Sequence, residues 1–388
     1  MNDIDKRSIA LHEKIKGKIE IQNKIKVNTM DDLSLVYSPG VAAPCLEIQK
    51  TPDRVYDLTM KSNTVAVISD GSAVLGLGNI GASAAIPVME GKCMLFKKFA
   101  NIDAFPICLD TQNTEEIIQT IKNIAPVFGG INLEDFSAPR CFEIEERLQD
   151  IGIPVFHDDQ HGTAIVTLAG MMNACKVVGK ELSELKIVIN GAGAAGTAIA
   201  KILRCINHNP DLCAPVKEIL VCDSKGIISK NRNNLSEVKQ ELLTFTNKDN
   251  LDGSLKDALK DADAFIGVSV GNILSSDDIQ LMTTNPIIFA LANPTPEIDP
   301  YLAKKAGAAV VSTGRSDFPN QVNNVLVFPG IFKVALENRC EQITSKMKLM
   351  TAIAIASFIE NPEPDLIIPS PFSEGMVERI NEYVMKVL

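Results

Sequence analysis

A glycine-rich turn between a predicted strand and a predicted helix constrains the fold of this chain most strongly. Gly191, Gly193 and Gly196 directly follow the apolar run 186–190, and a helical pattern covers residues 196–207. In a βαβ unit such glycines permit the tight turn, the approach of backbone to a pyrophosphate and the packing of helix on strand. The helix N-terminus adds attraction for the phosphates. The sequence therefore predicts a dinucleotide-binding unit, and the alternative is a purely structural strand–helix turn.

The next predicted strand, residues 218–222, ends at an acid, Asp223. An acid at this point accepts hydrogen bonds from the ribose hydroxyls and disfavours a 2′-phosphate, so it favours NAD over NADP. Asp223 lies 27 positions after Gly196, and a loop over residues 207–215 accounts for the excess over the usual ~20. Lys225 is close enough to weaken the preference, so NADP stays open as an alternative. The residues predicted to contact the cofactor here are Gly191, Gly193, Ala194, Ala195, Gly196, Thr197 and Asp223.

Short β-rich runs alternate with helical patterns along nearly the whole chain, which indicates an α/β fold. In the first half we expect strands at residues 65–69, 104–109, 127–133 and 153–156, and helices at 82–99, 114–124 and 138–150. In the second half we expect strands at 186–190, 218–222, 264–268, 287–291 and 308–311, and helices at 196–207, 255–262 and 300–306. Residues 334–388 read as mostly helical, with an interruption at 361–364.

A long helical pattern over residues 160–178 connects the two halves, and we place a domain boundary near its start. Residues 1–160 are predicted to form an N-terminal α/β domain that carries catalytic and metal-binding residues. Residues 161–388 are predicted to form a doubly wound Rossmann-type NAD(P)-binding domain with C-terminal helices. A cleft between the two domains is the expected place for a small-molecule site.

The charge of the chain excludes several classes of partner. The net charge is -10 and the sequence pI is about 5.1, so we expect no binding to nucleic acid or to anionic membranes. The longest apolar run, residues 349–359, is too short to span a bilayer, and the N-terminus has no signal-peptide pattern. These features predict a soluble, cytoplasmic protein.

Nine cysteines are present, and none forms a Cys-x-x-Cys pair. Most lie inside apolar segments, so we expect buried free thiols in a reducing compartment. A thiol nucleophile and a zinc site are the alternatives.

Two pairs of adjacent acids, Glu134-Asp135 and Asp158-Asp159, follow successive predicted strands. Adjacent residues on an extended chain point to opposite sides. One member of each pair can therefore face a cleft, while the other member supports the first from behind. Carboxylate oxygens are hard ligands that suit Mg²⁺ or Mn²⁺. Each pair by itself favours a helix cap, but the two pairs together favour a metal site.

His157 and His161 flank the second acid pair. Their spacing would place them on one helical face, as zinc ligands often are. However, the two acids between them are expected to precede the helix start, so a role in orienting the acids, or a structural role, is favoured over zinc.

Seven motifs distributed over nearly the whole chain agree with one enzyme family. They are Leu33-Ser-Leu-Val-Tyr-Ser-Pro-Gly-Val-Ala42, Asp70-Gly-Ser-Ala-Val-Leu-Gly-Leu-Gly-Asn-Ile-Gly81, Met89-Glu-Gly-Lys92, Phe156-His-Asp-Asp-Gln-His-Gly-Thr163, Gly191-Ala-Gly-Ala-Ala-Gly196, Ala290-Leu-Ala-Asn-Pro-Thr-Pro296 and Asn323-Asn-Val-Leu-Val-Phe-Pro-Gly330. With these motifs the chain resembles the malic enzymes, specifically the short form found in bacteria.

The resemblance implies oxidative decarboxylation of (S)-malate to pyruvate and CO₂ with reduction of NAD⁺, and also decarboxylation of oxaloacetate. It further implies a divalent cation, Mg²⁺ or Mn²⁺, and a homodimer. An enzyme that prefers NADP or uses both cofactors is the nearer alternative. A non-catalytic dinucleotide-binding regulatory module is the more distant one.

The resemblance also assigns roles to individual residues. Tyr37 matches the general acid that protonates C3 of enolpyruvate, Lys92 the general base that takes the C2 hydroxyl proton, and Asp158 the acid that supports the lysine. Without the resemblance, Lys92 would be taken for a solvated lysine and Tyr37 for a packing residue. The implied metal ligands are Glu134, Asp135 and Asp159. The implied substrate residues are Asn293, which also lies near the nicotinamide, Asn323 and Asn324.

The implied chemistry is physically reasonable, because malate can chelate a divalent ion that favours ionisation of its hydroxyl. A lysine near a cation also has a depressed pKa and can act as a base. One position departs from the family, because larger members carry an arginine where this chain has Ala73. The substrate carboxylate is then expected to meet the metal, the asparagines, or a lysine such as Lys97 or Lys98.

Overall fold

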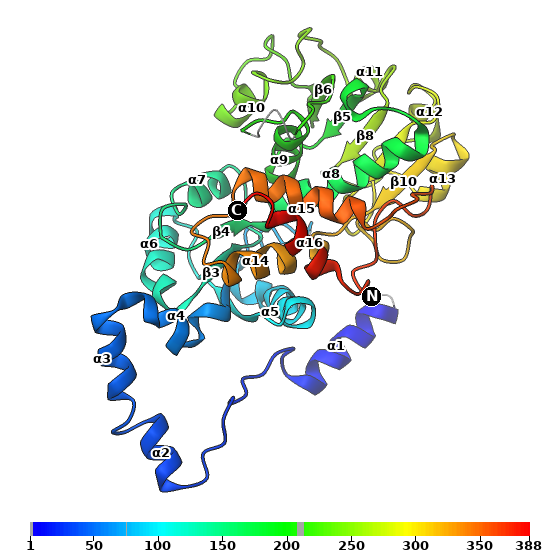
Figure 1. Cartoon of the computed structure of the whole chain (residues 1–388). Helices are drawn as coiled ribbons and strands as arrows, with labels where there is room; N and C mark the ends of the chain where they lie inside the picture. The colour runs from blue at the N-terminus through cyan, green and yellow to red at the C-terminus, as the bar shows by residue number, and fades with distance from the viewer. Residues whose placement is uncertain (1–2, 75, 208–212) are drawn as a thin grey trace.

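The computed structural model describes residues 3–74, 76–207 and 213–388, and these form two sheets joined by one long helix, α8 (Asp158–Val178) (Figure 1). The first sheet has the order β2-β1-β3-β4 and is parallel throughout. Its strands are β1 (Thr64–Ser69), β2 (Asp103–Cys108), β3 (Gly130–Leu133) and β4 (Val155–His157). Its connecting helices are α5 (Gly81–Ala100), α6 (Thr114–Ile124) and α7 (Arg140–Glu146). The four strands predicted for the first half are therefore present.

The second sheet has the order β10-β9-β8-β5-β6-β7. Its strands are β5 (Lys186–Asn190), β6 (Glu218–Asp223), β7 (Gly226–Ile227), β8 (Ala264–Gly267), β9 (Ile287–Ala290) and β10 (Val310–Thr313). Its helices are α9 (Ala194–Leu203), α10 (Glu237–Leu242), α11 (Leu255–Leu259), α12 (Ser276–Ile279) and α13 (Pro300–Lys305). Strand order reverses at β5, as in a doubly wound sheet, which confirms the predicted α/β fold. Sequence periodicity missed β7, which is antiparallel and has two residues.

Among the C-terminal helices, α14 (Phe328–Glu337) packs on α5 and α15 (Ser345–Ser357) packs on α8, while α16 (Met376–Val384) packs on both α14 and α15 (Figure 1). The rings of Phe96 and Phe328 lie 4.7 Å apart. Asn173 Nδ2 donates to the carbonyls of Ala356 at 2.9 Å and Ile367 at 3.0 Å. One apolar core thus includes residues of both sheets. The boundary at residue 160 remains a prediction.

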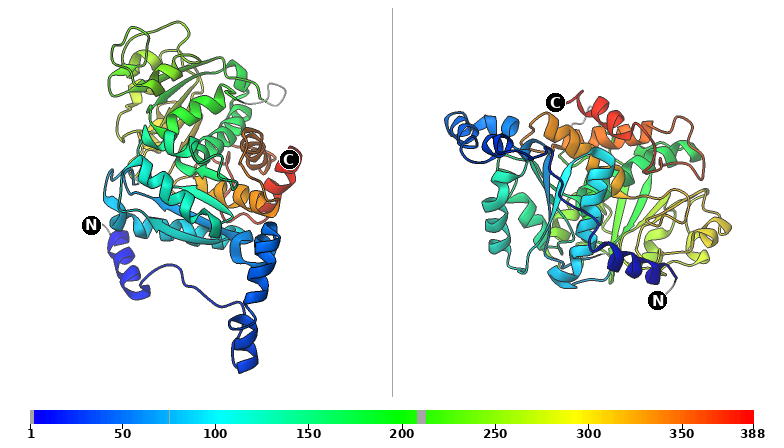
Figure 2. Two further views of the ribbon diagram at one scale, coloured as in Figure 1. Left: turned by 90° about the vertical axis from the view of Figure 1, so that its left-hand side faces the viewer. Right: turned by 90° about the horizontal axis from the view of Figure 1, so that it is seen from below.

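The N-terminal segment forms an arm with helices α1 (Asp3–Ile15), α2 (Met30–Val36), α3 (Ala42–Lys50) and α4 (Val55–Leu58). In Figures 1 and 2, α2 and α3 stand away from both sheets. Helices α1, α2 and α3 bury none of their residues. Short 3₁₀ turns complete the described elements: η1 (Pro52–Arg54), η2 (Met60–Asn63), η3 (Ala125–Val127), η4 (Leu182–Glu184) and η5 (Asn324–Leu326).

The prediction that all nine cysteines are free is wrong for two of them, because Cys205 and Cys213 form a disulfide. The chain leaves α9 and returns so that their Cα atoms are 5.8 Å apart, a separation that a disulfide bridges. The predicted loop 207–215 includes residues 208–212, which lie outside the described residues. The other seven cysteines are free thiols, and burial raises the pKa of Cys141, Cys175 and Cys222 to about 12. These thiols are unsuited to be nucleophiles.

Among the described helices, none combines the length and the apolar character needed to cross a bilayer.

Candidate active site

The two acid pairs meet at the carboxyl edge of the first sheet. β3 and β4 are neighbours with Leu133 opposite His157, so the residues that follow each strand come together. Oxygens of Glu134, Asp135 and Asp159 all lie within 4.8 Å of one another. Asp135 N also donates to Asp159 Oδ2 at 2.7 Å, which holds the two turns together.

The electrostatics of this acid cluster fit a divalent cation. Burial, together with the negative charge of Asp159, raises the pKa of Glu134 to about 7. Burial, together with Asp158, raises the pKa of Asp159 to about 6. Closely spaced buried carboxylates resist ionisation unless a positive charge compensates them. Three hard oxygen donors suit Mg²⁺ or Mn²⁺.

The helix-cap interpretation of the acids does not describe the structure. Helix α7 starts at Arg140 with Pro139 as its N-cap, so Glu134 and Asp135 lie too far upstream to cap it. The N-cap of α8 is His157, and Asp158 and Asp159 occupy the first turn. The acids therefore lie at the edge of the first sheet and not at the N-cap positions of these helices.

Lys92 extends from α5 into the acid cluster. Its side chain is buried, its Nζ lies 2.8 Å from Glu134 Oε1, and it forms an ion pair with Asp158. Burial disfavours the ammonium, but Asp158 and Glu134 outweigh it and raise the pKa of Lys92 above its ordinary value. From the sequence we expected the pKa of Lys92 to be depressed. That would require a cation that competes with Lys92 for the carboxylates of Asp158 and Glu134. The Nζ also lies 4.2 Å from the ring centroid of Phe328, on α14.

Asn324 joins this group from the C-terminal half. Its side-chain amide favours the ionised form of Asp158 and so partly offsets the effect of burial, which raises the pKa of that acid to about 7. Gly162 makes the approach possible, because a Cβ there would lie 1.9 Å from Asp158 Oδ1 and 2.9 Å from Asn324 Cβ. Asn323 instead accepts from Val325 N at 2.9 Å, as the N-cap of η5.

The glycine turn has the geometry that a dinucleotide site requires. Gly191 has φ 129, and a Cβ at Gly196 would lie 1.8 Å from Gly191 O. Gly193 is the N-cap of α9, so Ala194 and the residues after it begin the helix. The predicted strand, turn and helix are thus all in place.

The basic side chains of Arg232 and Lys239 bind Asp223, and the sequence analysis did not identify either of them. Its Oδ1 accepts from Lys225 N at 2.8 Å and from Arg232 Nη1 at 3.0 Å. Its Oδ2 accepts from Arg232 Nη2 at 2.8 Å and from Lys239 Nζ at 2.6 Å. Burial alone would raise the pKa of Asp223, but these bonds hold it well below its ordinary value. Nothing in the spacing of Arg232 and Lys239 marks them as partners of this acid.

Asn293 lies between the two sheets. A Cβ at Gly76, in the glycine-rich loop of the first half, would lie 2.3 Å from Asn293 O. A Cβ at Gly314 would lie 2.6 Å from Asn293 Nδ2. Only glycines at both positions allow the asparagine to sit at this junction.

Tyr37 is not brought to the acid cluster within one chain. It is the C-cap of α2 on the N-terminal arm, and 68% of it is exposed. Lys97 is also remote from this chemistry, since it pairs with Asp103 at 2.8 Å and is half exposed. Lys98 lines a separate cavity beside α16.

The zinc alternative is not supported by the placement of the histidines. His157 is fully buried at the start of α8, whereas His161 Nε2 bonds Glu145 Oε2 at 3.0 Å. Within the described residues, the one cluster suited to a metal contains acids alone. Sequence reasoning missed Glu145, although it lies on the apolar face of α7 beside Cys141 and Ile144, where an acid is unexpected.

Comparison with known proteins agrees with this geometry. Residues 16–149 match the family model of the malic enzyme N-terminal domain, and residues 160–387 match that of the malic enzyme NAD-binding domain. The chain belongs to the malic enzyme family. A "Bifunctional malic/malolactic enzyme" of Bacillus subtilis is 54% identical, over 98% of this chain and 92% of that protein. An "NAD-dependent malic enzyme" of Geobacillus stearothermophilus is 55% identical, over 99% of this chain and 79% of that protein.

Solved malic enzyme structures share this fold. The crystal structure of an NAD-dependent malic enzyme from Thermotoga maritima superposes with a TM-score of 0.92. It is 49% identical and the match covers 97% of this chain and 98% of that one. The likeness thus includes the arrangement of both sheets, on which the site described above depends.

Proposed function

We propose that this protein is a malic enzyme that converts (S)-malate and NAD⁺ into pyruvate, CO₂ and NADH with the help of Mg²⁺ or Mn²⁺. The observation that carries the proposal is the buried group of Lys92, Asp158 and Glu134 beside Asp135 and Asp159. A cofactor sensor needs neither a buried lysine nor a three-carboxylate group, so this group also argues against a regulatory module.

The contacts of the residues support the roles that we propose for them. Glu134, Asp135 and Asp159 are the residues that would hold the divalent cation, which supplies Lewis acidity that favours ionisation of the C2 hydroxyl and polarises the resulting ketone. If Glu134 held the cation, it would stabilise the Lys92 ammonium less, and the pKa of Lys92 would be lowered towards that of a useful base. Lys92 then takes the hydroxyl proton while Asp158 holds its Nζ in place.

The cofactor and substrate residues complete the proposal. The glycine turn and the start of α9 would bind the pyrophosphate, and Asp223 the ribose, which makes NAD the proposed cofactor. Asn293, at the junction of the sheets, would lie near the nicotinamide and the substrate. Asn324 would contact malate next to Asp158, and Asn323 is proposed as its neighbour in the substrate site. Hydride transfer to the nicotinamide is the chemistry of the cofactor itself.

We further propose that two copies associate through the N-terminal arm, and that Tyr37 acts in the site of the second copy. Helices α1, α2 and α3 bury none of their own residues, and large apolar side chains are exposed on α2 and on the segment between α1 and α2. Ile21 is 85% exposed, Met30 76% and Leu35 69%. Apolar surface of this extent marks a protein interface. A docked arm would bring the Tyr37 hydroxyl to C3 of enolpyruvate.

The cytoplasm, where NAD and malate are available, is the proposed location of this protein.

Malate-dependent NADH formation tests the function. The wild type with Mn²⁺ should produce NADH, and Lys92→Ala should lose ~100-fold or more of the turnover while it retains NADH binding. Lys97→Ala, an exposed position on the same helix, is the matched control and should retain normal turnover. Near-normal turnover of Lys92→Ala would contradict the assignment.

Subunit complementation tests the shared site. Tyr37→Phe and Lys92→Ala should each be inactive alone as homodimers. Random pairing after coexpression yields heterodimers with one intact site, and about a quarter of wild-type activity should return. No recovery in verified heterodimers would contradict the placement of Tyr37 in the second copy.

A further inference from the structure

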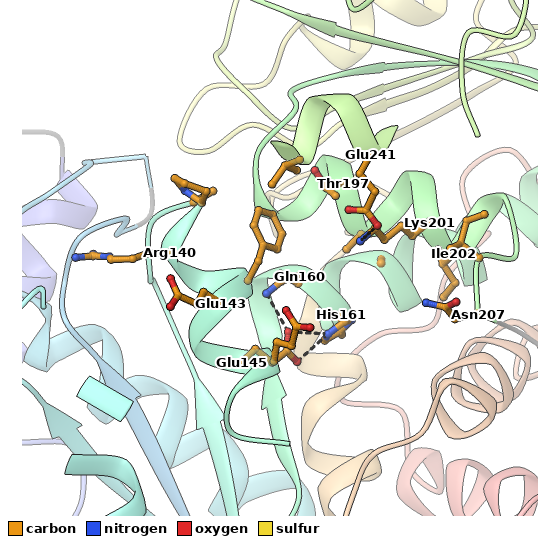
Figure 3. A pocket seen from close by; sticks show the side chains of 18 of the residues that line it. Arg140, Glu143, Glu145, Gln160, His161, Thr197, Lys201, Ile202, Asn207 and Glu241 are labelled. Carbon is orange, nitrogen blue, oxygen red and sulfur yellow. Dashed lines mark hydrogen bonds and ion pairs between the residues drawn. The ribbon is translucent and has the colours of Figure 1, made fainter. Parts of the chain in front are cut away.

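Glu145 is a buried acid on α7 that collects three hydrogen-bond donors from a single turn. Its Oε1 accepts the backbone N–H of His157 at 3.2 Å. Its Oε2 accepts from Gln160 Nε2 at 3.0 Å, and His161 Nε2 lies 3.0 Å from Oε2 and 2.8 Å from Oε1. Figure 3 shows Glu145, Gln160 and His161 converging at the wall of a cavity of about 1390 Å³. The carboxylate is therefore saturated by one short segment of chain.

That segment is the one that presents Asp158 and Asp159. His157 immediately precedes the two acids, and Gln160 and His161 immediately follow them. The N-cap of α8 is His157, and its side chain makes no capping bond. The first N–H groups of a helix need acceptors from elsewhere. Glu145, from a neighbouring helix, thus stabilises a helix start that has no cap of its own.

The surroundings of Glu145 keep it ionised and fixed. Burial alone would raise the pKa of Glu145, but His161 and Lys348 outweigh burial and lower it to about 2. Lys348, on α15, also packs with its Nζ 5.8 Å from the ring centroid of Phe156, in β4. Helices α7 and α15 thus both contact the junction of β4 and α8.

We propose that Glu145 is a positioning residue, which fixes the β4–α8 turn and thereby sets the affinity of the acid cluster for its divalent cation. The inference rests on the proposed metal site. Glu145 does not belong to the three carboxylates that approach one another within 4.8 Å, so it would act through Asp159, the member of that group that the turn carries. Groups that orient metal ligands typically contribute 10–100-fold to metal affinity.

Neighbouring residues supply matched variants. Glu145→Gln keeps the shape but offers one acceptor oxygen where the turn needs two. Gln160→Met removes one donor and leaves the carboxylate intact. Glu146→Gln makes the same chemical change one residue away, at an exposed position that lines the same cavity.

The test measures Mn²⁺ binding directly, from the electron paramagnetic resonance signal of free Mn²⁺ in titrations of the whole protein, with NADH affinity measured by its fluorescence. Glu145→Gln should raise the Kd for Mn²⁺ by 10–100-fold, and Gln160→Met by about threefold. Glu146→Gln should stay within about twofold of the wild type, and NADH affinity should stay unchanged in all three. At saturating Mn²⁺, the kcat of Glu145→Gln should return towards that of the wild type.

Two results would overturn the proposal: wild-type Mn²⁺ affinity in folded Glu145→Gln, or a parallel loss of Mn²⁺ and NADH affinity, which indicates general damage. If Glu145→Gln does not fold, an unchanged Mn²⁺ affinity of Gln160→Met overturns it instead. A wild type that binds Mn²⁺ but does not oxidise malate would refute the proposed function alone, because the Mn²⁺ readout needs no turnover.

Discussion

Replacing Glu297 by glutamine removes a buried ionisable group beside the second sheet, in the segment between β9 and α13, with little change of shape. Glu297 is fully buried, and its carboxylate accepts from Ala292 N at 3.0 Å and Ser269 N at 3.4 Å. It fits closely over β8, because a Cβ at Gly267 would lie 2.2 Å from its Cδ. No basic side chain is among the groups that shift its titration. Its ionisation is therefore opposed by burial and supported by backbone donors alone.

The effect on stability follows from the two pKa values. Burial raises the pKa of Glu297 from 4.5 to about 7. A carboxyl group with a raised pKa stabilises the folded state fully below its unfolded pKa, and this stability is lost as the pH rises through the folded pKa. At about 1.4 kcal/mol per pKa unit, the stability at stake is about 3 kcal/mol, most of it lost between pH 5 and pH 8.

Urea unfolding at several pH values, followed by circular dichroism, measures this effect; the chain has no tryptophan to report by fluorescence. The glutamine loses part of one hydrogen bond at every pH, which shifts the whole curve by a constant amount. The difference in unfolding free energy, wild type minus Glu297→Gln, should fall by about 2–3 kcal/mol from pH 5 to pH 8. The acids of the metal cluster titrate in both the wild type and Glu297→Gln, so their contribution to the unfolding free energy cancels in this difference. Parallel profiles would refute the assignment of a raised pKa to Glu297.

Three further predictions concern the active site. Asp223→Ser should free Arg232 and Lys239 to meet a 2′-phosphate, so the ratio of kcat/KM for NADP⁺ to that for NAD⁺ should rise ~10-fold or more; an unchanged ratio would show that the acid does not select the cofactor. Gly162→Ala places a methyl group 1.9 Å from Asp158 Oδ1, so kcat for malate should fall ~100-fold while the affinity for NADH is retained, and normal turnover would count against the role of Asp158. Removal of divalent ions with EDTA should abolish malate oxidation, and Mn²⁺ or Mg²⁺ should restore it; activity that survives EDTA would exclude the metal mechanism.

The sequence predicts the layers of this fold well, because buried parallel strands are short apolar runs and each helix between them shows its own period. It failed for β7, which has too few residues to show a period. It also failed for the disulfide between Cys205 and Cys213, because pairing depends on how the chain returns after α9. The exposure of the N-terminal arm could not be foreseen either, since its apolar side chains resemble those of a buried segment.

In the candidate site, too, some residues could be predicted from the sequence and others could not. The paired acids could be located from their positions after strands, because parallel strands end at one edge of a sheet. The role of Lys92 needed the resemblance to a family, since a lysine in a helix is ordinarily solvated. Arg232 and Glu145 escaped prediction because their partners are fixed by tertiary packing, and neither has a spacing that carries information.

Product analysis tests the central claim most directly. The purified protein should be incubated with (S)-malate, NAD⁺ and Mn²⁺, and NADH and pyruvate should be measured in the same sample. Metal-assisted oxidative decarboxylation predicts equal amounts of NADH and pyruvate, with both lost in Lys92→Ala. NADH formed with oxaloacetate and without pyruvate, or no NADH with either NAD⁺ or NADP⁺, would contradict it.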